Sequence, residues 1–176
     1  MEEIARAAGL SKGGLAHYFK SKNELFQSTF KEFFDRVFQR VREESSQIEG
    51  PMEKLLGFDL LFDMEDPDAQ AGYPLLFDCM CLAVRDGTYR ALFDEWVNNW
   101  VALLRDVIEK GVEQGIFAGI DAESMARAVS ALYQGVATRW YLATGSHSRA
   151  WALESVRKGV LGLMAPYMTA KEAKTG

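Results

Sequence analysis

Residues 4–25 of the 176-residue chain have the sequence IARAAGLSKGGLAHYFKSKNEL. Two residues divide this stretch into short helices. Gly9 can adopt the positive φ with which helices commonly end, and Ser11 is a typical N-cap for a second helix. The pattern therefore predicts helices at about residues 2–8 and 11–19 joined by a short turn, which is the arrangement of a helix-turn-helix module.

A third, much longer helix is predicted directly after this module. The run from Ser21 to Glu24 has the S-x-x-E form of a capping box, which marks a helix start. Apolar residues then recur every three or four positions to about residue 44, as on one face of an amphipathic helix. These apolar residues are Phe26, Phe30, Phe33, Val37 and Val41.

Helical periodicity continues through the rest of the chain, and no alternating stretch is long enough to predict a strand. We expect an all-α fold with a DNA-binding domain at residues 1–45, including the long connecting helix, and a helical ligand-binding and dimerisation domain at residues 46–176. The breaks fall at Ser45–Pro51, Asp66-Pro67, Asp86-Gly87, Gly115–Gly119 and Gly145-Ser146. The predicted helices of the body cover residues 51–64, 73–85, 88–114, 122–143 and 148–168.

The composition is that of an ordinary globular protein, with 48% hydrophobic and 26% charged residues. No apolar run is long enough to span a bilayer, so we expect a soluble, cytoplasmic protein without a membrane partner. The net charge of −5 is unevenly spread. Residues 1–22 carry a balance of +2 and residues 47–176 a balance of −6, which favours phosphate contact at one end only.

The residues that usually carry catalysis or bind metal are sparse and scattered. Cys79 and Cys81 are two positions apart on a predicted helix, so their side chains diverge, and we expect both to be buried thiols. His147 is expected to be solvated in a loop. Neither a nucleophilic triad, a metal site nor a phosphate-cradling glycine loop is recognisable. We therefore expect no enzyme activity, no catalytic residue, no metal and no cofactor.

The second short helix presents few apolar groups outward. Gly13 and Gly14 each cost about 1 kcal/mol relative to alanine inside a helix. Close approach to DNA would explain them, while fraying or tight packing on a neighbour is the alternative. The small core expected to hold the two helices comprises Ile4, Ala5, Ala8, Leu10, Leu15 and Phe19, and the outward face Lys12, Gly13, Gly14, Ala16 and His17.

The run over residues 4–25 resembles the signature of the TetR family of bacterial transcriptional regulators, from the second helix of its DNA-binding module into the fourth. The resemblance implies that the start of the second helix meets the groove wall and base edges of double-stranded DNA. It also implies that a tyrosine hydroxyl and a helix N-terminus bind phosphates. The implied DNA-binding residues are Ser11, Lys12, Gly13, Gly14, His17, Tyr18 and Lys22.

Two departures from the family pattern bear on this module. Many relatives carry an aromatic residue where this chain has Ala16, and a hydroxyl or amide residue where it has Gly14, which affects the operator sequence rather than DNA binding as such. The family's modules also begin with one more helix, before the position of Met1. We therefore expect the natural protein to be longer at its N-terminus.

Aromatic residues are dense between residues 58 and 141. Core packing accounts for most of them, but aromatic walls with a few polar groups are also how small-molecule pockets are built. In the family the helical body holds an inducer, so the resemblance implies a pocket for an apolar or aromatic small molecule. The expected ligand-binding residues are Phe58, Phe62, Phe77, Trp96, Trp100, Tyr133 and Trp140.

The last two predicted helices combine small and apolar residues, which suits either a buried core or a four-helix contact between two copies. The resemblance favours a homodimer on a palindromic operator, and so a ligand-responsive repressor. The alternative is a helical small-molecule-binding or scaffolding protein that does not bind DNA. The apolar residues expected at the contact are Leu132, Val136, Val156, Val160, Leu163 and Met164.

Overall fold

The computed structural model describes residues 2–7, 9 and 11–169, apart from the side chains of Ile4 and Lys12. This part of the chain is helical, as expected, and its only β-type pairing is one isolated bridge between Phe117 and Met168. The elements are α1 (Glu2–Ala7), α2 (Lys12–Tyr18), α3 (Lys22–Ser46), α4 (Pro51–Leu56), η1 (Asp59–Phe62), α5 (Pro67–Ala83), α6 (Gly87–Glu113), α7 (Ala122–Leu142), α8 (Arg149–Met164) and η2 (Ala165–Tyr167).

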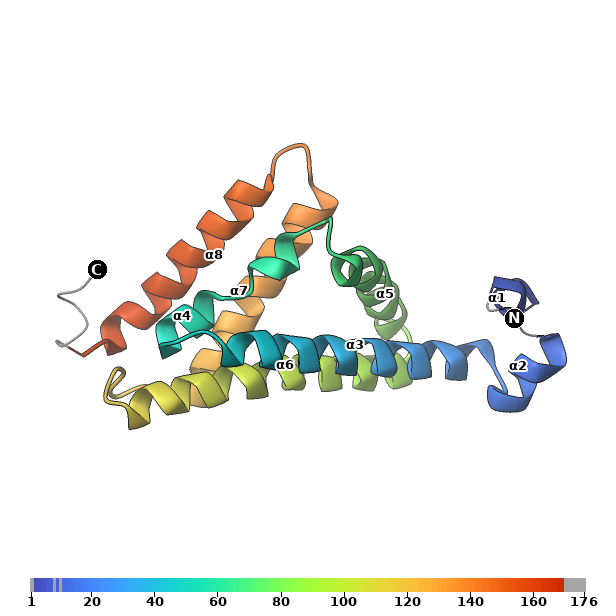
Figure 1. Cartoon of the computed structure of the whole chain (residues 1–176), viewed down its shortest axis with the longest axis horizontal. Coiled ribbons are helices and arrows are strands. Elements are labelled where there is room, and N and C mark those ends of the chain that lie inside the picture. Colours follow the sequence, from blue (N-terminus) through green and yellow to red (C-terminus); the bar gives the residue numbers. More distant parts are fainter. Residues whose placement is uncertain (1, 8, 10, 170–176) are drawn as a thin grey trace.

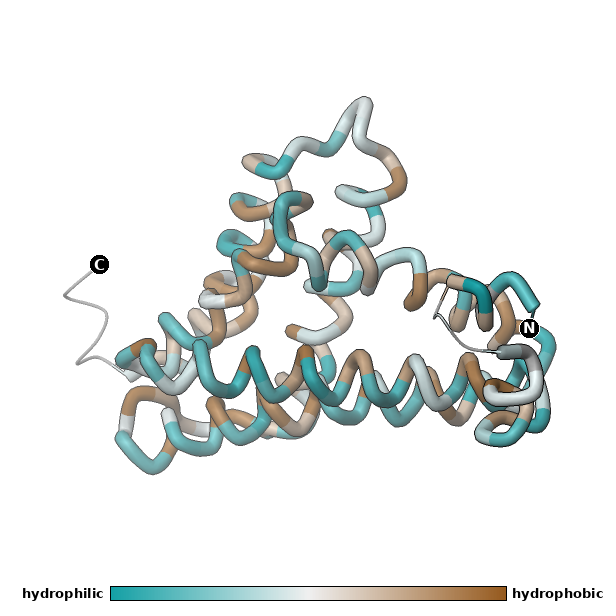
Figure 2. The backbone as a smooth tube through the Cα atoms, turned by 45° about the vertical axis from the view of Figure 1, so that its right-hand side comes forward, coloured by the Kyte–Doolittle hydropathy of each residue, from teal (hydrophilic) through white to brown (hydrophobic). Residues whose placement is uncertain are grey.

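The two long helices α3 and α6 lie side by side and form the base of the molecule (Figure 1). The short helices α1 and α2 lie at one end of α3, whereas α4, α7 and α8 gather toward its other end (Figure 1). Helix α5 packs against α3 and α6 between these groups. Apolar and polar residues alternate along α3 with helical spacing (Figure 2), so one side of α3 faces the body while the other meets solvent.

The core is built around the aromatic face of α3. Phe30, Phe34, Val37, Phe38 and Val41 are all buried. Edge-to-face contacts join this face to α6, with ring centroids 5.8 Å apart for Phe34 and Trp96 and 5.0 Å apart for Phe38 and Trp100. Such pairs stabilise beyond their buried area, so they fix α3 against the body.

Capping residues account for most helix starts. Ser11 accepts a hydrogen bond from Gly14 N at 3.0 Å, and Ser21 accepts one from Glu24 N at 3.1 Å, as the sequence predicted. The Glu24 carboxylate bonds Lys20 N at 2.7 Å, one residue before the cap of an ideal capping box. The caps of the body helices are Asp66, Asp86, Asp121 and Ser148.

Three predicted helix boundaries were wrong. Helix α4 ends at Leu56, where Gly57 caps it, and a separate 3-10 helix follows, so residues 51–64 are not one helix. Helix α5 starts at Pro67 and contains Pro74, because proline fits the first turn of a helix and Pro67 therefore begins the helix instead of separating two. The last α-helix ends at Met164, just before a proline-containing 3-10 turn.

Two side chains have surroundings that differ from those expected. Cys79 is a buried thiol 3.8 Å from Tyr89 O, and burial raises its pKa to about 11, but Cys81 is exposed. His147 is half-buried rather than solvated: Nδ1 lies 3.2 Å from Ala143 O and the ring packs edge-on against Trp151 at 4.2 Å. Both differences depend on which face of a helix or loop meets the rest of the body.

Two features are missing from the residues that the structure describes, a membrane-spanning helix and a metal-binding cluster. Among these residues, no helix is long and apolar enough to cross a membrane. The same residues contain no group of three or more histidine, cysteine, aspartate or glutamate side chains that could hold a metal ion.

Close packing at Gly111 gives a test of the fold. A Cβ at this position would overlap the ring of buried Phe117 and lie 3.1 Å from Pro51 Cβ. We expect Gly111→Ala to lower the free energy of unfolding by about 1–3 kcal/mol, although alanine is the better helix former. Gly87→Ala, where nothing lies within 4 Å, is the matched control and should be neutral or stabilising by up to about 1 kcal/mol. Urea unfolding at equal protein concentration measures both, and equal effects would contradict the packing described.

Candidate DNA interface and ligand pocket

Helices α1 and α2 pack against each other and form a small module at the end of α3 (Figure 1). Gly9 links them with φ +67°, the left-handed conformation that favours glycine. Ala5 and Leu15 are 2% and 4% exposed, so they hold the two helices together, and Phe19 is half-buried. Of the other predicted core residues, Ala8, Leu10 and the side chain of Ile4 lie outside the described residues.

The outer side of α2 has open space around its glycines. Gly13 is exposed, and nothing lies within 4 Å of the place where its Cβ would stand, so packing within the chain does not explain this glycine. At Gly14 a Cβ would meet Ser11 Oγ at 3.2 Å. Both glycines therefore leave the first turn of α2 accessible to a flat or grooved partner such as DNA.

The remaining predicted DNA-binding residues lie along α2 and at the start of α3. Tyr18 is 71% exposed and meets His17 edge-on at 5.4 Å. Lys22 is exposed in the first turn of α3, beside the backbone amides that start this helix. Lys12 starts α2, but its side chain lies outside the described residues. These residues and the exposed Ser11 occupy the end of the molecule where positive charge exceeds negative charge.

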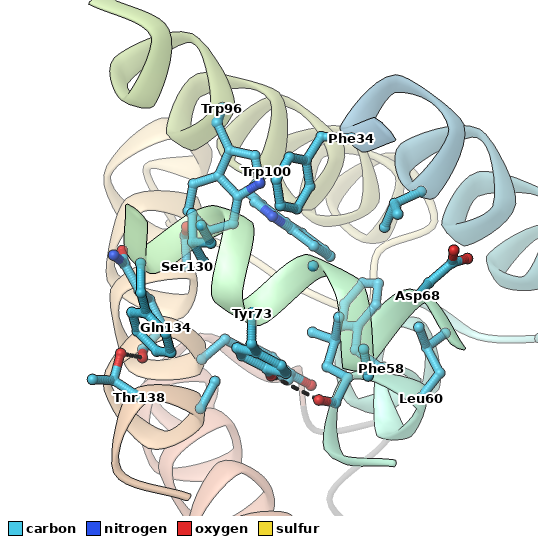
Figure 3. A pocket seen from close by; sticks show the side chains of 18 of the residues that line it. Phe34, Phe58, Leu60, Asp68, Tyr73, Trp96, Trp100, Ser130, Gln134 and Thr138 are labelled. Carbon is cyan, nitrogen blue, oxygen red and sulfur yellow. Dashed lines mark hydrogen bonds between the residues drawn. The ribbon is translucent and has the colours of Figure 1, made fainter. Parts of the chain in front are cut away.

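A cavity of about 90 Å³ lies within the body. Its walls come from α3, the segment from Phe58 to Leu61, α5, α6 and α7 (Figure 3). The lining is almost entirely apolar. The lining residues are Phe33, Phe34, Val37, Phe58, Leu60, Leu61, Asp68, Ala69, Gly72, Tyr73, Leu76, Phe77, Trp96, Trp100, Leu104, Ser130, Tyr133, Gln134, Ala137 and Thr138.

The structure brings most of the predicted ligand-binding residues together. The lining includes Phe58, Phe77, Trp96, Trp100 and Tyr133. The two other predicted residues do not line the cavity: Phe62 and Trp140 are buried against each other, with ring centroids 5.6 Å apart. They pack behind Tyr133 and Tyr73, respectively, and so support the wall from outside.

Sequence reasoning missed most of the other lining residues, and two groups of them are informative. Phe33, Phe34 and Val37 belong to α3, which was predicted only as a connecting helix. Polar residues recur every fourth position along α7 and line the cavity: Ser130, Gln134 and Thr138. This i, i+4, i+8 spacing places them on one helix face and was the signal that could have revealed them.

The tyrosine hydroxyls of the cavity are already engaged by the protein. Tyr73 donates to Leu61 O at 2.7 Å (Figure 3), and Tyr133 donates to Leu55 O at 2.9 Å. Burial raises the pKa of both tyrosines above the ordinary value, so both remain neutral at physiological pH. These bonds orient the rings as walls and leave little hydrogen-bonding capacity for a ligand.

One buried donor in the lining has no protein partner. Among the described residues, Trp96 Nε1 is the only side-chain nitrogen or oxygen atom that is itself fully inaccessible to solvent and lacks a hydrogen bond. Ser130 Oγ also makes no hydrogen bond with a described residue, although this serine is only 8% exposed. Unsatisfied buried polar groups are rare in proteins and call for an explanation.

An ion-pair network joins the connecting helix to the start of α5. Arg40 of α3 binds Asp66 in a bidentate manner, at 2.6 and 3.0 Å, and contacts Asp68 at 3.1 Å. Arg36 binds Asp68 at 3.0 Å. The bond from Arg40 lowers the pKa of Asp66 against the opposing effect of burial. Because Asp68 also lines the cavity, these ion pairs connect the cavity wall directly to α3.

The apolar residues expected at a dimer contact are largely buried within one chain. Val136, Val156, Val160 and Met164 belong to the core, while Leu132 and Leu163 are half-buried against it. The free face of α7 instead carries an open groove. It is lined by Ala131, Gln134, Gly135, Thr138 and Arg139, and Leu142, 64% exposed, follows on the same helix.

Comparison with known families accounts for both parts of this architecture. The family description "BetI-type transcriptional repressor, C-terminal" matches residues 51–165, and "bacterial regulatory proteins, tetR family" matches residues 1–29. The chain belongs to the TetR family. This is a family of transcriptional regulators rather than of enzymes, and the two matches together cover the module and the body.

Individual TetR-family relatives are distant. The repressor KstR2 of Mycolicibacterium smegmatis is 35% identical over 57 residues, 32% of this chain and only 28% of that protein. KstR2 of Mycobacterium tuberculosis is 23% identical over 80% of this chain and 70% of its own length. Two solved structures share the fold, the TetR-family regulator of Cytophaga hutchinsonii (TM-score 0.79, 20% identity, 96% of this chain and 84% of that chain) and Bacillus subtilis FadR in complex with stearoyl-CoA (0.68, 21%, 93% and 86%).

The ion pair between Arg40 and Asp66 predicts a pH-dependent contribution to stability. Asp66→Asn keeps an N-cap for α5 but removes the charge, so we expect a loss of about 1–3 kcal/mol near pH 7. Because the folded-state pKa of Asp66 lies below its unfolded value, this contribution is present above about pH 4 and disappears as the pH falls through the lowered pKa.

Chemical unfolding between pH 7 and pH 2 measures this difference between wild type and Asp66→Asn. Asp78→Asn, an exposed position on the same helix, is the control and should have little effect at any pH. A difference for Asp66→Asn that stays constant over the whole range would contradict the role of the charge.

Proposed function

We propose that the chain is a ligand-responsive transcriptional repressor that binds a palindromic operator as a homodimer. The observation that carries the proposal is the double role of α3. Its first turn starts with the exposed Lys22 beside the module of α1 and α2, while its Phe33, Phe34 and Val37 line the body cavity. One rigid element thus connects the place for DNA with the place for a ligand.

The DNA-binding part of the proposal rests on the module. In a helix-turn-helix, the N-terminal residues of the second helix contact base edges in the major groove. The exposed Ser11, Gly13 and His17 are suited to this role, and the Tyr18 hydroxyl and Lys22 are suited to phosphates. The family, whose relatives include the KstR2 repressors, supports this reading over a protein that binds no DNA.

The regulatory part rests on the cavity and its neighbours. A ligand between α3, α5 and α6 favours a different distance between these helices, because aromatic walls are closely packed and cannot yield individually. The population of chains whose α3 points correctly for the operator then falls. A solved relative, FadR, contains stearoyl-CoA, which supports a mostly apolar ligand in a body of this fold.

The alternative is a helical small-molecule-binding or scaffolding protein without DNA binding. The aromatic cavity fits it equally well. The exposed Gly13 and the positive end of the molecule do not fit this alternative, since neither helps a protein whose only task is to hold a small molecule. A gel shift with DNA flanking the protein's own gene separates the two functions, and a complete lack of binding favours the alternative.

Removal of a phosphate contact tests the interface directly. We expect Lys22→Ala to weaken operator binding and to reduce the slope of log K against log salt by about 1 per site, because one counterion fewer is released. Lys110→Ala, an exposed lysine near the far end of α6, is the control and should change neither quantity. Fluorescence anisotropy over a salt series measures both, and an unchanged slope for Lys22→Ala would remove this lysine from the interface.

Dimerisation through α7 is tested at an exposed position, since Val136 and Val160, which the sequence placed at the contact, are buried within one chain. Ala131 lies exposed in the groove of α7, so Ala131→Arg should leave each chain folded but block the contact through bulk and charge. Sedimentation is expected to show dimer for wild type and monomer for the variant. Ala91→Arg on the exposed face of α6 is the control. A dimer of Ala131→Arg as tight as wild type would place the contact elsewhere.

A further inference from the structure

The cavity has a chemical polarity that narrows the class of ligand it can accept. Its volume of about 90 Å³ is well below the roughly 300–1,000 Å³ of sites for drug-sized molecules. Its lining nevertheless extends from Phe33 on α3 to Thr138 on α7. A space this small, here called the slit, fits a single alkyl chain better than a fused ring system.

The interior of the slit has no positive charge. None of its lining residues is lysine, arginine or histidine, and its only carboxylate, Asp68, is occupied by Arg36 and Arg40. A buried carboxylate or phosphate without a cationic partner is strongly disfavoured. The part of a ligand that lies inside the slit is therefore uncharged.

Three hydrogen-bonding side chains of the slit remain unused, and two of them are buried. Trp96 Nε1 has no acceptor, and Figure 3 shows this nitrogen turned toward the rings of Phe34 and Trp100. The face of an aromatic ring is only a weak acceptor. Ser130 Oγ, on the neighbouring helix α7, has no partner among the described residues either. Since the two tyrosine hydroxyls are satisfied, the buried free capacity consists of an N–H donor and a hydroxyl. The third unused group, the Gln134 amide, is only half-buried and also borders the open groove of α7.

We infer that the slit takes a slender, uncharged chain bearing one hydrogen-bond acceptor, such as a ketone or ester carbonyl, which Trp96 Nε1 and Ser130 Oγ bind. This inference rests on the proposed ligand-responsive function and specifies its ligand class. The carbonyl oxygen satisfies the buried indole N–H, and the alkyl chain runs along the aromatic walls toward α3. Entry of the chain between Phe34 and Trp96 loosens the contact that fixes α3 against α6.

Three probes of matched length test the inference: undecan-2-one, its isosteric alkene 2-methylundec-1-ene, and undecanoate at pH 8. Equilibrium dialysis with detection by mass spectrometry gives the Kd of each. For the wild-type protein we expect the ketone to bind about five- to tenfold more tightly than the alkene, the equivalent of one hydrogen bond. Undecanoate should bind at least about tenfold more weakly than the ketone.

Variants of Trp96 and Ser130 test whether these two side chains cause the preference for the ketone over the alkene. Trp96→Phe and Ser130→Ala should each reduce the ratio of alkene Kd to ketone Kd toward one, even where overall affinity changes through altered packing. Trp151→Phe and Ser124→Ala, which lie outside the cavity lining, should keep the wild-type ratio. Equal affinity of the wild type for ketone and alkene, tight binding of undecanoate, or a ratio that survives in both donor variants would overturn the inference.

Failure of the ligand class and failure of the regulatory function give different results. If undecan-2-one binds with the expected preference but leaves DNA affinity unchanged, the ligand class stands and ligand-responsive regulation by this class fails. If none of the probes binds while DNA binding persists, the ligand class is overturned and the DNA-binding function stands.

Discussion

The edge-to-face contacts between the aromatic face of α3 and the tryptophans of α6 are the constraint on which the structure depends. Phe34 meets Trp96 and Phe38 meets Trp100, and these four rings belong to one continuous core. They determine where α3 points. Since α1 and α2 lie at the far end of α3 (Figure 1), a small rotation at these rings becomes a large displacement of the helix proposed to enter the major groove.

The same rings also form part of the wall of the ligand cavity. Phe34, Trp96 and Trp100 are both core residues and cavity walls, so a ligand in the cavity contacts the same rings that position α3. The network from Arg40 to Asp66 and Asp68 adds a second, electrostatic connection between α3 and the start of α5. Coupling between the cavity and the DNA-binding module would therefore require only two alternative packing arrangements of the interface between α3 and α6.

The sequence predicted those features that depend on neighbouring residues. The positive φ of Gly9 and the caps Ser11 and Ser21 follow from local backbone chemistry, and all three are present. Features that depend on which helices pack against each other were harder to predict from the sequence. Phe62 is an aromatic residue of the kind that lines pockets, but it packs behind Tyr133. Val136 lies in the core of one chain instead of on a free face. Helical periodicity identifies an apolar face, not the neighbour that covers it.

We propose that α3 transmits occupation of the cavity to the DNA-binding module. Distances between spin labels test it most directly. The labels are placed at Ser28→Cys on the exposed face of α3, in a Cys81→Ala background that removes the exposed native thiol. Electron–electron double resonance then compares the dimer alone, with operator DNA, and with saturating undecan-2-one. The account predicts that the ketone shifts the distances away from those of the DNA complex; distances that stay the same when the cavity is saturated would contradict it.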